Sequence, residues 1–186
     1  MKALGAVLAG GAAARLGGAK ATAELAGRPL IAYSLEALGG AGLELVVVAK
    51  RDSLLPALEI PVVVEPDEPR HPLTGVVAAL RHADGRPALV CACDTPFITL
   101  AALETLAASG CTTIGRTADR LHPLLALYMP DTLAPLERAL ASNDSATLAA
   151  QGLGPAYLDI SEGEAFNVNT PEDLARAETM LTQLRL

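Results

Sequence analysis

Short apolar runs recur along this sequence, and segments with helical periodicity separate them. A run without polar alternation is typical of a strand buried on both faces of a sheet, whereas apolar residues three and four apart favour a helix. The expected strands cover residues 3–8, 44–49, 60–65, 88–93, 111–114, 124–128 and 156–160. The expected helices cover residues 29–38, 73–82, 99–109, 130–141 and 171–184. This alternation predicts an α/β fold, a three-layer α/β/α sandwich around a mostly parallel twisted sheet.

Local signals mark the ends of some of these elements. Pro29 stands in the first turn of its helix, and Gly39, Gly40 and Gly42 are expected to stop that helix. Thr170 is expected to cap the last helix, which has acidic residues in its first turn. No internal repeat or low-complexity linker divides the 186 residues, so we expect one domain over residues 1–186.

Charge and cysteine usage exclude several classes of protein. The 14 basic residues are scattered among 21 acidic ones, so no concentrated basic face for nucleic acid is expected. The three cysteines, Cys91, Cys93 and Cys111, have neither disulfide-framework nor zinc-ligand spacing. Cys91 and Cys93 lie in an apolar run, which predicts buried thiols.

The N-terminus imitates a short signal peptide, because Lys2 precedes an apolar stretch. Gly5 interrupts that stretch, which serves better as a first strand leading into a glycine-rich loop. No apolar run reaches the roughly 20 residues that a membrane-spanning helix needs. We therefore expect a cytoplasmic protein without nucleic-acid or membrane partners.

Chemistry-bearing residues follow the expected strands. Ligands of parallel sheets bind outside the carboxyl ends of the strands, so these segments should converge on one crevice. We expect this of Arg15, Lys20, Asp94 and Asn169 in particular. The segments are residues 8–20, 65–75, 94–97 and 167–169.

The first segment is a glycine-rich loop that reads LAGGAAARLGGAK over residues 8–20. It is neither the G-x-x-x-x-G-K-[ST] phosphate loop nor the G-x-G-x-x-G dinucleotide fingerprint. Its glycines still allow backbone N–H groups to approach phosphate oxygens. Arg15 can grip a phosphate with two hydrogen bonds, and Lys20 can neutralise its charge. The alternative is an ordinary flexible connection between a strand and a helix.

Asp94 and the two asparagines have a functional and a structural interpretation each. Asp94 can hold Mg²⁺ that bridges to phosphates, or it can cap the following helix. Asn167 and Asn169 are two residues apart, so their amides point the same way in an extended chain. They can orient a metal's water shell or a phosphate, or Asn169 can cap the last helix.

The segment 65–75 contains Gly75, which allows close approach of a ligand to the start of the next helix. The charged residues Glu68 and Arg70 are best interpreted as parts of a solvated loop. His71 and His122 both precede a proline, and either can be structural.

Taken in order, six segments resemble the molybdenum cofactor guanylyltransferase family, whose fold is that of the nucleotide-diphospho-sugar transferases, a Rossmann-like nucleotidyltransferase fold. The resemblance runs from about Leu4 to about Glu178. His71 departs from it, because the family usually has Gly there. The segments are LAGGAAARLGGAK (8–20), GRPL (27–30), PLTG (72–75), CDTPF (93–97), HPLLAL (122–127) and FNVNTPEDL (166–174).

The resemblance implies transfer of GMP from Mg-GTP to the phosphate of molybdopterin or the molybdenum cofactor, with release of pyrophosphate. Further partners would be other cofactor-biosynthesis proteins and recipient molybdoenzymes. Asp67 and Gly75 would flank the guanine nucleotide, and Asp94 would bind Mg²⁺. The implied catalytic residues are Arg15, Lys20, Asp94 and Asn169. The implied cofactor-binding residues are Leu8, Ala9, Gly10, Gly11, Lys20, Asp67, Gly75, Asp94 and Asn167.

Two alternatives stay open: a related nucleotidyltransferase that uses CTP or another phosphorylated acceptor, and a nucleotide-binding regulator without catalysis. A dinucleotide oxidoreductase is disfavoured, because the G-x-G fingerprint is absent. GTP is expected to be preferred over CTP and ATP. Guanine presents N1–H and an amine beside O6, and the backbone of residues 8–11 offers both acceptors and donors. Asp67 would add an acceptor if its loop folds inward.

Overall fold

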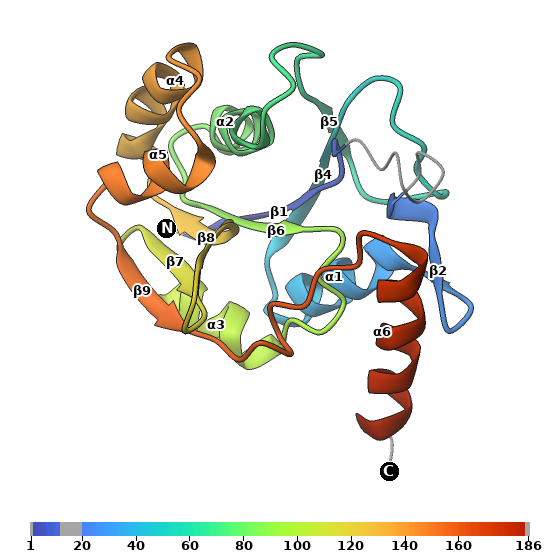
Figure 1. The fold of residues 1–186 in the computed structure, drawn as a ribbon. Coiled ribbons are helices and arrows are strands. Elements are labelled where there is room, and N and C mark those ends of the chain that lie inside the picture. The colour runs from blue at the N-terminus through green and yellow to red at the C-terminus, as the bar shows by residue number, and fades with distance from the viewer. Residues whose placement is uncertain (1, 12–19, 185–186) are drawn as a thin grey trace.

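A single sheet organises the part of the chain that the computed structural model describes, residues 2–11 and 20–184 (Figure 1). Its seven strands have the order β5-β4-β1-β6-β8-β7-β9. Only β8 runs against the others, because it pairs antiparallel with both β6 and β7. The mostly parallel sheet is thus confirmed. The strands are β1 (Leu4–Leu8), β4 (Glu44–Ala49), β5 (Val62–Val64), β6 (Ala88–Ala92), β7 (Thr113–Arg116), β8 (Leu121–Tyr128) and β9 (Ala156–Asp159).

Helices cover both faces of the sheet, which confirms the three-layer sandwich (Figure 1). On one face α2 (Pro72–Ala83), α4 (Leu133–Ala141) and α5 (Ala146–Gly152) enclose one core cluster. On the other face α1 (Leu30–Gly40) and α3 (Leu100–Ala108) enclose a second. Successive side chains of a strand alternate between the faces. In the fully buried β1, Leu4 therefore packs in the first cluster and Val7 in the second.

A small unit outside the sandwich was not expected from the sequence. The strands β2 (Glu24–Leu25) and β3 (Arg28–Pro29) pair antiparallel, and Ala26 and Gly27 between them both have positive φ. Two central residues with positive φ suit the tight turn of a hairpin. The hairpin packs against α6 (Pro171–Leu184), which extends away from the sheet (Figure 1). Strands of two residues carry too little periodicity to be recognised in a sequence.

Several element boundaries were wrong. Helix α1 starts one residue after Pro29 and continues through Gly39 and Gly40, ending before Gly42, whose φ is +67°. Helix α5 was missed; Ser145 caps it by accepting a hydrogen bond from the Leu148 N–H. The helix expected over residues 130–141 opens as a 3-10 turn, Pro130–Thr132. Hydrophobic periodicity locates the middle of an element better than its ends.

The expected cap of the last helix is confirmed. The Thr170 Oγ1 accepts a hydrogen bond from the Asp173 N–H, and the Asp173 carboxylate accepts one from the Thr170 N–H, each at 3.1 Å. This reciprocal arrangement satisfies two helix-end donors at once. Within residues 2–11 and 20–184, no helix combines the length and the apolar character that crossing a bilayer requires.

The cysteines give a testable difference in reactivity. Cys91 and Cys93 are buried, as expected, and Cys111 is exposed. Burial raises the pKa of the Cys91 thiol to about 11 and also raises that of Cys93. Since the thiolate is the nucleophile, iodoacetamide at about pH 8 should rapidly alkylate Cys111 alone in the folded protein, as read by intact mass. Cys111→Ser should remove this adduct, and rapid modification of a second thiol before unfolding would contradict the prediction.

Candidate active site

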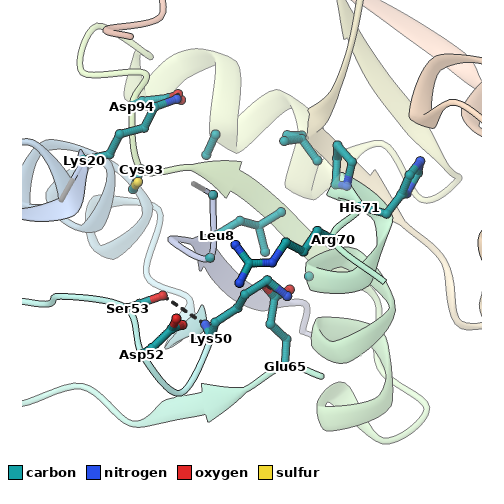
Figure 2. A pocket seen from close by; sticks show the side chains of 16 residues that line it. Leu8, Lys20, Lys50, Asp52, Ser53, Glu65, Arg70, His71, Cys93 and Asp94 are labelled. Atoms are coloured by element: carbon teal, nitrogen blue, oxygen red, sulfur yellow. Dashed lines mark hydrogen bonds and ion pairs between the residues drawn. The ribbon is translucent and has the colours of Figure 1, made fainter. Parts of the chain in front are cut away.

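The segments that follow β1, β5 and β6 meet at the carboxyl edge of the sheet, as expected, and the segment that follows β4 joins them there. Hydrogen bonds join them there: the Cys93 N–H donates to the Leu8 carbonyl at 3.1 Å, and the Ala9 N–H donates to the Val48 carbonyl at 2.8 Å. These segments and the start of α2 line a cavity of about 490 Å³ (Figure 2). That volume lies in the range of small-molecule binding sites.

Lys20 connects three distant parts of the chain at one end of this cavity. Its Nζ lies 2.7 Å from Asp94 Oδ2 and 2.5 Å from Asn169 Oδ1. Asn167 donates its amide to the other Asp94 oxygen at 2.9 Å. The side chains of Lys20 and Asp94 are only 18% and 11% exposed, so this ion pair is shielded from water. The structure thus brings together three of the four residues expected around one crevice; Arg15 lies outside the described residues.

The main chain around Asp94 is held by two hydroxyl groups. Ser34 of α1 and Thr95 both donate to the Ala92 carbonyl, at 3.0 and 2.8 Å. The Asp94 carbonyl in turn accepts a hydrogen bond from the Val168 N–H at 2.9 Å. Asp94 does not cap α3, because Thr99 does so by accepting from the Ala102 N–H. The carboxylate of Asp94 is therefore left for Lys20, Asn167 and a ligand.

The oxygen atoms of Asp94 and Asn169 suit a magnesium ion. The Lys20 ammonium lies between them and donates a hydrogen bond to each. These two oxygens therefore already face a common position that is occupied by a cationic group. Mg²⁺ prefers oxygen ligands and is commonly held by one or two carboxylates together with phosphates and water. No group of three His, Cys, Asp or Glu residues within the described ranges forms a metal cluster.

Residues 8–11 and Lys20 of the glycine-rich loop belong to the described part of the chain. Leu8, Gly10 and Gly11 line the cavity, whereas Ala9 is buried and uses its N–H for the Val48 carbonyl. A Cβ on Gly11 would meet no atom of residues 2–11 and 20–184 within 4 Å, and Gly11 lines the cavity. Gly10 is crowded instead: an added Cβ would lie 1.9 Å from Glu65 Oε1. The close approach of the Glu65 carboxylate therefore requires a glycine at position 10. The sequence alone did not indicate this packing reason for the glycine.

The segment 65–75 differs from the expectation at Asp67. Gly75 lines the cavity as expected, but the Asp67 side chain is exposed and is not part of the lining. The loop does not fold inward here; the Asp67 carbonyl accepts a hydrogen bond from Lys50 Nζ, and its side chain faces water. The buried acid of this segment is Glu65, which does line the cavity.

His71 and Arg70 both line the cavity, next to one another at the start of α2 (Figure 2). His71 also has the structural role that was considered, because its Nδ1 accepts the Leu73 N–H at 3.1 Å and caps α2. The Arg70 side chain is 63% exposed, which agrees with a solvated loop, and it also borders the cavity.

Sequence reasoning missed the residues that follow β4. Lys50, Asp52 and Ser53 line the cavity, and the Lys50 N–H donates to Ser53 Oγ at 3.1 Å (Figure 2). The sequence contained the signal, since Lys50 directly follows the buried end of β4 and Asp94 stands two residues after the end of β6. The same strand-end rule that selected Asp94 would have selected Lys50.

Comparisons with known proteins place this chain in a family. Residues 5–155 match the family model described as the MobA-like NTP transferase domain. The chain is 38% identical to a molybdenum cofactor guanylyltransferase of Cereibacter sphaeroides, over 97% of this chain and 98% of that protein. It is 35% identical to one of Rhodobacter capsulatus, over 98% of each chain. The crystal structure of molybdopterin-guanine dinucleotide biosynthesis protein A from Archaeoglobus fulgidus superposes with a TM-score of 0.79 at 28% identity, covering 97% of this chain and 99% of that one.

Proposed function

Since this chain belongs to the MobA-like NTP transferase family and is a nucleotidyltransferase, we propose that it transfers GMP from GTP to the phosphate of molybdopterin or the molybdenum cofactor. The observation that carries the proposal is the meeting of Lys20, Asp94 and Asn169 beside the cavity lined by the glycine-rich loop. The relatives with this chemistry in their names cover nearly all of the chain, which supports the same reaction here.

The reaction needs positioning and charge stabilisation more than acid–base chemistry. An oxygen of the acceptor phosphate attacks the α-phosphorus of GTP, and the bond from that phosphorus to the oxygen bridging to the β-phosphate breaks. The electron pair of that bond leaves on pyrophosphate. The attacking phosphate is already an anion, so no strong general base is required. The Lys20 ammonium can donate to the phosphate oxygens as their negative charge shifts. Arg15 as a second phosphate ligand remains a prediction.

Asp94 and Asn169 would hold Mg²⁺ when the nucleotide binds. The ion would neutralise charge on the phosphates. Asn167 orients the Asp94 carboxylate through its hydrogen bond, and we propose that it also lies on the acceptor side. Lys20 would then exchange its contacts with these oxygens for contacts with phosphate.

We further propose that residues 1–186 act as one domain in the cytoplasm. The packing of both helical layers on one sheet supports a single domain. The product would pass to molybdoenzymes, with other proteins of cofactor biosynthesis as further partners.

The test is turnover with molybdopterin and each of Mg-GTP, Mg-CTP and Mg-ATP, with the product identified by mass spectrometry and pyrophosphate measured in parallel. We expect a guanine dinucleotide product and a kcat/KM for GTP at least about 100-fold above that for CTP, since a mismatched base leaves buried polar groups unpaired. A value for CTP equal to or above that for GTP would assign the chain to cytidylyl transfer. Absence of pyrophosphate with all three nucleotides would favour the non-catalytic regulator.

A further inference from the structure

Ser34 is a polar residue in an apolar place. The face of α1 that packs against the sheet carries Leu30, Ile31, Leu35 and Leu38, and Ser34 is the one buried polar residue among them. Its exposed fraction is 0%, so its hydroxyl group is removed from water. A buried hydroxyl destabilises a protein unless it is hydrogen-bonded. An apolar side chain would suffice for packing at this position, so the hydroxyl indicates a further role.

The hydroxyl of Ser34 is used outside its own helix. A serine inside a helix often donates to a carbonyl one turn earlier in the same helix. The Ser34 Oγ instead donates to the Ala92 carbonyl at 3.0 Å, although the two residues are 58 positions apart in the sequence. Ala92 ends β6, and Asp94 stands two residues later. This hydrogen bond therefore fixes α1 to the turn that carries Asp94.

The Ala92 carbonyl lies where the pairing of β6 with β8 stops. That pairing ends at Cys91, opposite Leu125. One residue later, the Ala92 carbonyl accepts the hydroxyl of Ser34 and that of Thr95, which donates at 2.8 Å. A carbonyl oxygen has two lone pairs, so two hydroxyl groups satisfy it. Thr95 belongs to the turn itself, whereas Ser34 connects the turn to a separate helix.

Helix α1 also contacts the segment that carries Lys20. The 3-10 helix Lys20–Thr22 packs against α1, and the Leu30 N–H at the start of α1 donates to the Ala23 carbonyl at 2.8 Å. One helix thus holds both sides of the ion pair between Lys20 Nζ and Asp94 Oδ2, which are 2.7 Å apart. A shift of the Asp94 turn relative to α1 would change this distance.

We propose that Ser34 is a positioning residue: its hydrogen bond to the Ala92 carbonyl holds the Asp94 carboxylate where it meets Lys20 and the phosphates of the bound nucleotide. Ser34 is not part of the described lining of the cavity, so it acts through Asp94. The role rests on the proposed guanylyl transfer, in which Asp94 acts beside the phosphates. It gives a physical reason for the polar side chain on the buried face of α1.

Ser34→Ala separates a positioning role from a structural one. It should lower kcat with Mg-GTP and molybdopterin at least about tenfold, because a misplacement of about 1 Å at a reacting centre can cost about 100-fold. The KM for GTP should change much less, since the rest of the cavity wall is untouched. The free energy of unfolding should change little, because alanine is the better helix former and Thr95 still donates to the Ala92 carbonyl.

A second variant keeps the test decisive if Ser34→Ala does not fold. Ser34→Cys keeps nearly the same size but offers a weaker donor, and should lower kcat at least about threefold. Parental kcat in the folded Ser34→Cys protein would then overturn the proposal.

A binding measurement without turnover gives an independent readout. Mn²⁺ serves as a paramagnetic probe in place of Mg²⁺, and electron paramagnetic resonance measures its free concentration in the presence of GTP and without the acceptor. Groups that orient a metal ligand often change metal affinity about 10- to 100-fold, so Ser34→Ala should bind Mn²⁺ at least about threefold more weakly than the parent.

Thr132→Val is the matched control. Thr132 is also buried, and its hydroxyl donates to the Met129 carbonyl at 2.7 Å. Because β8 runs antiparallel to β6, this contact just after β8 lies at the opposite edge of the sheet from Asp94. The variant should keep the parental kcat and Mn²⁺ affinity even where it lowers the free energy of unfolding.

The outcomes separate the role of Ser34 from the proposed function. Parental kcat and Mn²⁺ affinity in Ser34→Ala would overturn the role, even when the parent makes the guanine dinucleotide product. Weaker Mn²⁺ binding by Ser34→Ala, in a parent that makes no such product, would keep the role and reject guanylyl transfer. A loss of stability alone, as in Thr132→Val, would show that Ser34 is purely structural.

Discussion

Asp94→Asn lowers kcat with Mg-GTP and molybdopterin at least about 100-fold and leaves the fold intact. Loss of one preorganised electrostatic contact at a reacting phosphate costs about 3 kcal/mol or more. The shape of the side chain is kept, but the charge that holds Lys20 and would hold Mg²⁺ is removed. Steady-state kinetics over a range of magnesium concentrations measures the effect, and circular dichroism follows the fold.

Asp84→Asn is the matched control for that experiment. Asp84 is exposed at the end of α2, away from the cavity, and its left-handed backbone conformation is one that Asn also tolerates. It should retain parental kinetics. Magnesium-dependent turnover of Asp94→Asn within a few-fold of the parent would refute the role given to Asp94.

Gly10→Ala destabilises the protein by about 2 kcal/mol and slows turnover of GTP. The new methyl group would lie 1.9 Å from Glu65 Oε1 and 2.8 Å from its Cδ, so the carboxylate would have to move and give up its present position beside Lys50. Inserting one methyl group into a packed site costs about 1–3 kcal/mol. Urea unfolding measures the loss of stability, and kcat/KM for GTP measures the effect on the cavity that Gly10 and Glu65 line.

Two further variants separate this clash from a backbone effect. Gly10 and Gly11 both lie outside the left-handed region, and a Cβ on Gly11 meets no atom of the described part of the chain within 4 Å. Gly11→Ala should therefore leave the free energy of unfolding nearly unchanged. In a Glu65→Ala background the cost of Gly10→Ala should largely disappear, as a double-mutant cycle would show. An equal cost with and without the Glu65 side chain would contradict the proposed clash.

Residues that follow buried strands could be located from the sequence, because the carboxyl ends of parallel strands meet at one edge. Asp94 and Gly75 were found in this way, and the structure places both at the cavity. Lys50 follows β4 and lines the cavity by the same rule. The antiparallel direction of β8 and the short hairpin β2–β3 were not predictable, because strand direction and pairing depend on distant partners.

Fold class, the glycine-rich loop and the segments that carry Asp94 and Asn169 were determined by the sequence alone, because each depends on local periodicity or on a motif. The tertiary structure decided which acid of the segment 65–75 faces the cavity. In a sequence, Glu65, Asp67 and Glu68 are equivalent carboxylates. In the folded protein, only Glu65 lies where two glycines leave room for it and Lys50 reaches it. Burial and charge pairing are properties of residues far apart in the chain, so they arise only when the segments meet.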